Sequence, residues 1–156
     1  MKFIPFYQFK LKLPYNKDEA LSRLYDNTKP SSFGDTHSRT KIFYGTLTDS
    51  SFKISKILKW YYENSFNPLA IGKLTDDGYY CHVNVVVRPT LSTLIFMFIW
   101  IGFFLKGLVV GLIVSNTIIW FNLGFVAFGY ILLSIGFWIE VPKLEIAMRK
   151  LLEDSD

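Results

Sequence analysis

Residues 91–139, LSTLIFMFIWIGFFLKGLVVGLIVSNTIIWFNLGFVAFGYILLSIGFWI, decide the fold of this chain. Two long apolar runs, 91–114 and 118–139, flank the polar break at 115–117, and Lys106 is the single charged side chain within them. At about 1.5 Å per residue, each run makes a helix of roughly 33–36 Å, enough to cross a hydrocarbon layer of about 30 Å. The stretch therefore predicts a transmembrane hairpin of two antiparallel helices.

The distribution of basic residues predicts the orientation of this hairpin. Of the 17 Lys and Arg residues, all but Lys106 lie in the two flanks, and the connector has none. The positive-inside rule then places both termini in the cytoplasm, with the protein in the inner (plasma) membrane. Lys106 itself has two interpretations: an intramembrane charge is a candidate functional residue, or its long side chain snorkels to the far headgroups.

A small-residue motif, Gly107 and Gly111, lies on the first predicted span. Such a G-x-x-x-G pair lets helix backbones approach closely, either within the hairpin or at a dimer face. In a hairpin folded about Asn116, Gly107 would lie opposite Phe125 and Gly111 opposite Phe121. We keep both interpretations open at this stage.

Residues 1–90 alternate polar and apolar residues and predict a small cytoplasmic α+β domain of about five strands in an antiparallel sheet, with one helix. The helix is capped at Asn16 and followed by a loop over 26–40. The strands are expected at residues 9–13, 41–47, from 52 onwards, 69–74 and 79–88. Asp77-Gly78 predicts a tight turn between the last two, because both central positions need positive φ. Alternation then places Cys81 in the core and His82 outside.

Two segments carry an amphipathic pattern. Residues 52–62 fit either a strand paired with 41–47 or a basic helix lying on the membrane, and we favour the strand. Residues 140–156 place Leu144, Met148 and Leu152 on one helical face. They predict a short C-terminal cytoplasmic helix that docks on the head or on the membrane surface.

The sequence gives no constellation for catalysis or for a metal or cofactor. His37, His82 and Cys81 are the only His and Cys residues, and neighbouring strand positions 81 and 82 point to opposite faces. Neither phosphate-binding glycine motif is present. Residues 1–90 hold 13 basic and 8 acidic residues, which is weak for a nucleic-acid surface. We expect neither an enzyme nor a nucleic-acid-binding protein, and we identify no small-molecule substrate.

The most basic and aromatic stretch of the head is the candidate binding surface. Its residues are Lys53, Lys56, Lys59, Trp60 and Arg88. They predict a non-enzymatic, membrane-tethered module that recognises a protein partner or anionic lipid headgroups.

Two other functions are possible. An oligomeric membrane effector would open a pore by associating through Gly107 and Gly111, with Lys106 and Asn116 lining it. A membrane enzyme would need a cluster of polar residues at one bilayer depth, which the sequence does not show.

Several short runs of the chain resemble uncharacterised short bacterial proteins that have a cytoplasmic β-rich head and a two-helix membrane anchor. The similar runs are Phe43–Gly45, Phe52–Ile57, Tyr62–Pro68, Ile71–Lys73, Phe128–Tyr130 and Gly136–Glu140. The likeness covers most of residues 41–150. It implies the same architecture, and because that family has no assigned activity it implies no functional site.

Overall fold

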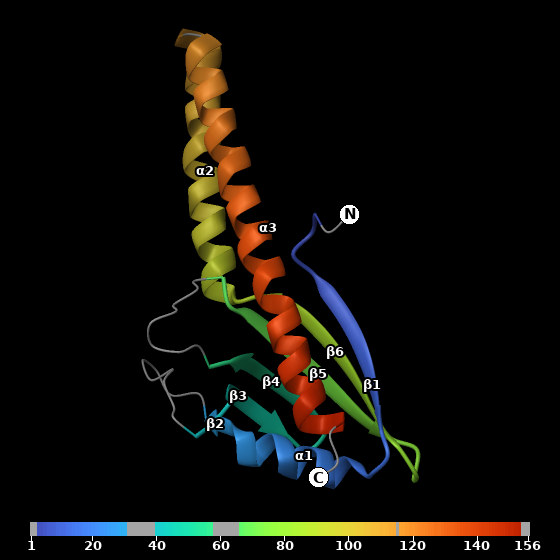
Figure 1. Ribbon diagram of the computed structural model, residues 1–156. Helices are drawn as coiled ribbons and strands as arrows, with labels where there is room; N and C mark the ends of the chain where they lie inside the picture. The colour runs from blue at the N-terminus through green and yellow to red at the C-terminus, as the bar shows by residue number, and fades with distance from the viewer. Residues whose placement is uncertain (1–2, 31–39, 58–65, 115, 154–156) are drawn as a thin grey trace.

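The computed structural model describes residues 3–30, 40–57, 66–114 and 116–153. The chain has an α+β fold in which a β-sheet head carries a long apolar helical hairpin (Figure 1). In chain order the elements are β1 (Tyr7–Leu13), α1 (Lys17–Asn27), β2 (Thr28–Pro30), β3 (Phe43–Thr48), β4 (Ser51–Lys56), β5 (Pro68–Asp76), β6 (Cys81–Pro89), α2 (Leu91–Val114) and α3 (Asn116–Glu153).

The sheet has six strands in the order β1-β6-β5-β4-β3-β2, and it is mixed rather than antiparallel. The prediction of about five antiparallel strands missed β2, which pairs in parallel with β3. This strand is three residues long, follows α1 directly and ends at Pro30. It is too short for an alternating apolar pattern, so the sequence reads there as a polar loop.

Residues 51–56 form a strand, as we favoured over a membrane-surface helix. β4 pairs antiparallel with β3, placing Ile54 opposite Gly45, and with β5 on its other side. A side chain at position 45 would collide with the backbone of Lys53, 2.0 Å from its Cβ, so glycine is required for this close approach. The remaining positions of the ambiguous segment, 58–62, lie outside the described residues.

The β5–β6 connection differs from the predicted two-residue turn. Strand pairing ends at Asp76 opposite Cys81, which leaves a loop of four residues, 77–80. Among the described residues only glycines have positive φ, Gly78 at 91° being one of them, so the turn cannot have positive φ at Asp77. The Asp77 carboxylate instead accepts hydrogen bonds from the backbone N–H groups of Tyr79 (3.1 Å) and Tyr80 (2.7 Å).

α3 is continuous over 38 residues and passes through Pro142 without ending. The predicted C-terminal helix is therefore the last part of the second long helix rather than a separate element. Its apolar face packs on the head, where Leu144, Met148 and Leu152 are buried. These side chains belong to the same core cluster as the inner faces of the strands and α1.

The core lies on one side of the sheet, beneath α1 and the end of α3 (Figure 1). Alternation along β6 follows the predicted pattern: Cys81, Val83, Val85 and Val87 are buried and the intervening residues are not. α1 begins at an Asn16 cap whose side chain accepts from the Glu19 N–H at 2.9 Å, as the capping motif predicts. The other side of the sheet has no described helix over it.

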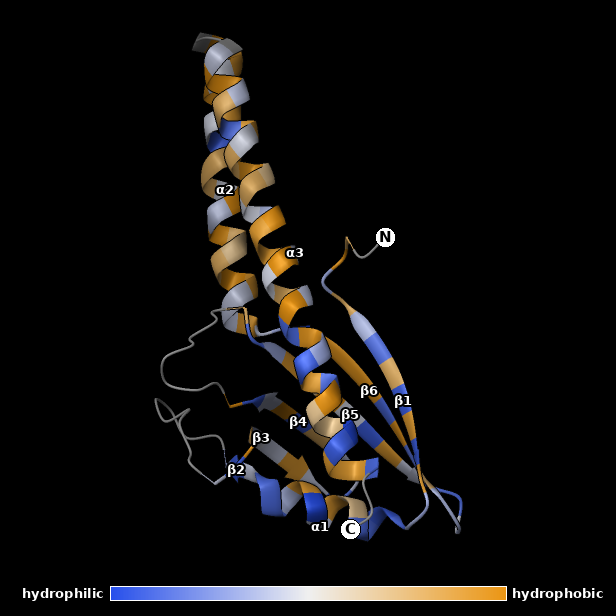
Figure 2. Cartoon of the chain, in the orientation of Figure 1, coloured by the Kyte–Doolittle hydropathy of each residue, from blue (hydrophilic) through white to orange (hydrophobic). Residues whose placement is uncertain are grey.

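Both α2 and α3 are long and apolar enough to cross a membrane. In each apolar segment only 11% of the residues are buried, whereas a core helix of a soluble protein is mostly buried. Figure 2 shows mostly apolar residues along the upper hairpin, interrupted by a small hydrophilic stretch, and polar residues on the lower end of α3 and on α1.

Candidate functional site

The side of the sheet that has no described helix over it carries a set of basic side chains, which we call the basic face. By strand alternation it consists of Lys10 and Lys12 on β1, Lys53 on β4, Lys73 on β5 and Arg88 on β6, all exposed. Asn84 of β6 pairs with Lys10 on one side and with Lys73 on the other. Neighbouring strands lie about 4.8 Å apart, so these two lysines stand about 10 Å apart across β6.

The described strand positions of this face include no acidic residue. The six strands contain one acidic residue, Asp76, which pairs with buried Cys81 and so belongs to the row of the covered face. The helices on that covered side carry acidic residues, among them Asp18 and Glu19 on α1 and Glu145 on α3. The two sides of the head therefore differ in charge.

The basic side chains of this face form no ion pairs with the described residues. The ion pairs there lie within α1, within α3 and between His82 and Asp77. Lys12 instead lies over the ring of Tyr80, 3.9 Å from its centroid. Among the residues that the structure describes, no acidic side chain neutralises the charges of this face.

The structure brings together part of the predicted binding surface. Lys53 and Arg88 share the basic face, on strands separated by β5. Lys56 lies three residues after Lys53 and so falls on the opposite, covered side of β4. Lys59 and Trp60 lie outside the described residues.

Three residues of the basic face were missed from the sequence: Lys10, Lys12 and Lys73. Lys10 and Lys12 alternate with buried residues of β1, which is the signal of an outward strand row. What the pattern did not give was strand order, because β1 pairs with β6, more than seventy residues later in the chain.

Apolar side chains occupy the centre of the same face. Leu69, Ile71 and Val86 are half-buried outward positions on β5 and β6, and Ile71 pairs with both Val86 and Lys53. The surface is thus an apolar centre with cationic side chains around it.

The β5–β6 loop at the end of this face is held by Asp77. Its carboxylate accepts from the Tyr80 and Tyr79 N–H groups and contacts His82 Nε2 at 3.1 Å. The pKa of Asp77 is lowered below its ordinary value of 3.8. The largest cause is the hydrogen bond from the Tyr80 N–H, and those from His82 and the Tyr79 N–H contribute less. The carboxylates of this turn are thus explained by loop geometry.

The thiol of Cys81 lies inside the core of the head. Burial raises the pKa of the Cys81 thiol, which is fully buried and therefore unsuited to act as a nucleophile. Among the described residues no group of three His, Cys, Asp or Glu side chains is placed to hold a metal ion.

The two glycines of the G-x-x-x-G motif face α3 of the same chain. A Cβ at Gly107 would lie 2.2 Å from Asn122 Oδ1, and one at Gly111 would lie 2.9 Å from Ile119 Cγ1. The expected partners were Phe125 for Gly107 and Phe121 for Gly111. The observed partners, Asn122 and Ile119, lie earlier in the sequence because α3 already begins at Asn116. Buried Asn122, which the sequence reasoning overlooked, also donates to the Ile118 carbonyl at 2.8 Å.

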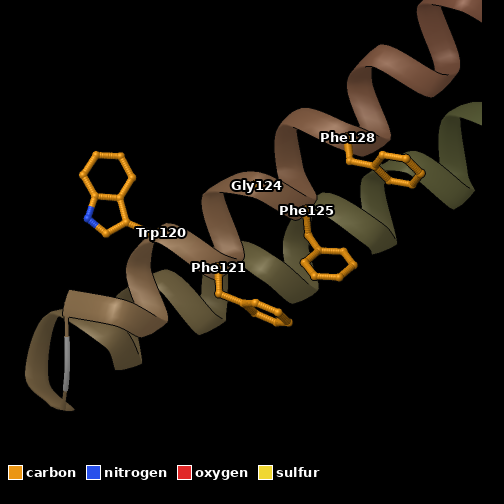
Figure 3. Close-up of a pocket in the computed structure, with 5 residues that line it drawn as sticks. All are labelled: Trp120, Phe121, Gly124, Phe125 and Phe128. Atoms are coloured by element: carbon orange, nitrogen blue, oxygen red, sulfur yellow. The ribbon is translucent and has the colours of Figure 1, made fainter.

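Lys106 is exposed on α2, while the side chain of Asn116 lies outside the described residues. A hollow of about 470 Å³ on α3 is lined by Trp120, Phe121, Gly124, Phe125 and Phe128. Figure 3 shows Phe121, Phe125 and Phe128 directed to one side of the helix and Trp120 directed away from them. Its lining side chains are apolar apart from the indole N–H of Trp120.

Comparison of the chain with family models, with curated proteins and with solved structures gives no match. The resemblance to short bacterial membrane proteins stays a prediction, and the function must be argued from the geometry.

Proposed function

We propose that this chain is a two-pass protein of the inner (plasma) membrane, with both termini cytoplasmic, whose basic face binds an acidic protein partner. The observation that carries the proposal is a sheet side with five exposed basic residues and no acidic one in its described strands. The two long apolar helices, largely unburied, support the membrane anchor. The positive-inside rule supports the orientation.

A protein partner fits this face better than lipid headgroups. β6 leads into α2 through Thr90, so Arg88 lies next to the first span. Lys12 pairs with His82, which precedes Arg88 by six residues in β6. Lys12 therefore lies up to about 20 Å from Arg88 along the strand direction. Because charges are screened over about 8 Å at physiological salt, most of the basic face lies beyond the reach of the headgroups.

The apolar residues at the centre of the basic face favour a protein over a nucleic acid as the partner. An apolar centre of Leu69, Ile71 and Val86 with a charged surround is the usual organisation of a protein interface. Single-stranded nucleic acid would need stacking aromatic side chains. At the outward positions of the described strands, Tyr44 is the one Phe, Tyr or Trp residue.

The oligomeric pore has less support than the binding module. Gly107 and Gly111 contact α3 of the same hairpin, so they are not free to form an interface with a second copy. A membrane enzyme gains no support from the groups around Lys106 or Asn122.

The proposal is tested with the full-length protein in nanodiscs of zwitterionic lipid and a fluorescein-labelled glutamate-rich peptide as the probe. We expect Lys73→Glu to weaken binding by about 10-fold, because it places a like charge against the peptide. Lys150→Glu makes the same charge change on the exposed end of α3 and serves as the matched control.

Equal binding by the Lys73→Glu variant and the unmodified protein would contradict the role of the basic face. A single-stranded oligonucleotide that displaces the peptide at lower concentration, through the same lysine, would assign the face to nucleic acid instead.

A further inference from the structure

The start of the chain lies along α3 rather than on the sheet. Tyr130 Oη donates a hydrogen bond to the carbonyl oxygen of Phe3 at 2.7 Å, and Ser134 Oγ donates to the same oxygen at 3.3 Å. Tyr130 and Ser134 are four residues apart and so lie on one face of α3. Figure 1 shows the N-terminal segment rising from β1 beside the hairpin, away from the sheet.

This contact is at the height of the apolar part of α3. The apolar run of the helix ends at Ile139, and buried Glu140 follows. Ser134 precedes Glu140 by six residues and Tyr130 precedes it by ten, which is about 9 Å and about 15 Å along the helix axis. Phe3 is therefore held well inside the level at which the hairpin is apolar.

The segment is suited to lipid in its side chains. Residues 3–6, Phe-Ile-Pro-Phe, contain no charge, and Phe3, Ile4 and Phe6 are 60%, 71% and 47% exposed. Three neighbouring large apolar side chains exposed beside an apolar helix are unfavourable in water and favourable in a bilayer.

Several backbone polar groups of the segment are paired, which matters in lipid because unpaired polar groups are costly there. The Phe3 carbonyl accepts from Tyr130 and Ser134, and the Phe6 N–H donates to the Ile4 carbonyl at 2.8 Å. Pro5 has no N–H to satisfy.

A mostly apolar groove lies between the segment and α3. It has a volume of about 460 Å³ and is lined by Phe3, Tyr130, Ile131, Ser134, Ile135 and Trp138. Tyr and Trp side chains are enriched where a protein meets the boundary between headgroups and hydrocarbon.

We infer that residues 3–6 insert into the cytoplasmic leaflet and form a third attachment to the membrane, with a phospholipid acyl chain in the groove beside α3. This inference rests on the membrane crossing proposed above. The two hydroxyls of α3 fix the segment at its depth, and its apolar side chains contact lipid.

The test measures the depth of residue 4 in the full-length protein reconstituted in liposomes. Ile4→Cys is labelled with a nitroxide, and its collisions with oxygen and with a water-soluble nickel chelate are compared by electron paramagnetic resonance. Native Cys81 is fully buried, and the unmodified chain measures any label that it takes. Leu132→Cys on α3, which does not line the groove, and Tyr25→Cys on α1, both at exposed positions, give the lipid and water references.

We expect the label at residue 4 to favour oxygen as the label at residue 132 does. A label at residue 4 that behaves as the one at residue 25, while residue 132 remains in lipid, would overturn the inference and leave the membrane crossing intact. A water-exposed label at residue 132 would instead refute the crossing itself.

A second variant tests the attachment. Tyr130→Phe combined with Ser134→Ala removes both donors to the Phe3 carbonyl, and both replacements suit an apolar helix. We expect the label at residue 4 to become at least several-fold more accessible to the nickel chelate. Unchanged accessibility would contradict the role of the two hydroxyls.

Discussion

We expect Leu144→Ala to destabilise the folded head, although Leu144 follows the second apolar run and lies far from the strands in sequence. The structure places this side chain in the core cluster of the sheet, where it is 1% exposed. A Leu→Ala change at a fully buried site costs about 2–5 kcal/mol in the free energy of unfolding. Ile146, two residues later on the same helix, is 65% exposed, so Ile146→Ala is the matched control.

The chain contains its own reporter for this experiment. Cys81 is the one cysteine and is fully buried in the same core cluster as Leu144. Its reaction with a thiol reagent therefore requires opening of the head, and the labelling rate follows the opening equilibrium. A loss of 2–5 kcal/mol corresponds to an increase of about 30-fold to several thousand-fold in that rate, for the protein in nanodiscs.

Ile146→Ala should change the labelling rate less than about threefold, since exposed substitutions usually lie within about 0.5 kcal/mol. Both variants should label at the same rate in denaturant, which controls for the chemistry of the thiol. Amide hydrogen exchange of β6 gives a second measurement that does not depend on Cys81. If Cys81 labelling and β6 hydrogen exchange are equally slow in the Leu144→Ala and Ile146→Ala variants, the end of α3 is not part of the core.

Two further perturbations test the loop and the hairpin. Because the folded loop lowers the pKa of Asp77, the ionised carboxylate stabilises the folded loop, and this stabilisation is fully present at pH values above the ordinary pKa of 3.8. The stabilisation is lost as the pH falls through the lowered pKa. Asp77→Asn should therefore increase proteolysis of the loop at neutral pH and abolish its dependence on pH in that acidic range; a loop that keeps the dependence would contradict the assignment. Gly107→Ala places a Cβ 2.2 Å from Asn122 Oδ1, whereas Gly102→Ala meets no atom within 4 Å. The first should destabilise the hairpin by about 1–3 kcal/mol in a detergent unfolding assay and the second should not, and equal effects would show that close packing at Gly107 is unimportant.

Local periodicity predicted the parts of the fold that depend on neighbouring residues. The alternation of β6, the helix cap at Asn16 and the first apolar run each depend on residues within one element, and the structure has the corresponding elements where the sequence placed them. The second apolar run is helical as predicted, but its helix continues into the head as part of α3. The β5–β6 hairpin was also predictable, but the geometry of its loop was not. Asp77-Gly78 favours a two-residue turn, yet hydrogen bonds to the Asp77 carboxylate stabilise the longer loop instead.

Features that depend on pairings distant in sequence were less accessible. β2 is defined by its parallel contact with β3 and has no pattern of its own. The apolar stripe of Leu144, Met148 and Leu152 was visible, but the sequence left open whether it met the head or the membrane. The basic face required the strand order, because Lys10 and Lys73 are neighbours only through β6.

The two connections between the head and the hairpin determine how the basic face is presented. Thr90 is the single residue between β6 and α2, and α3 enters the head without leaving its helical path. A head joined through a flexible linker would sample many orientations, whereas two direct connections hold this head in one orientation relative to α2 and α3. A partner that meets a face of fixed orientation loses less orientational freedom on binding. The continuity of α3, which supplies part of the core of the head and one half of the hairpin, thus supports the proposal that the basic face acts as a membrane-anchored docking surface.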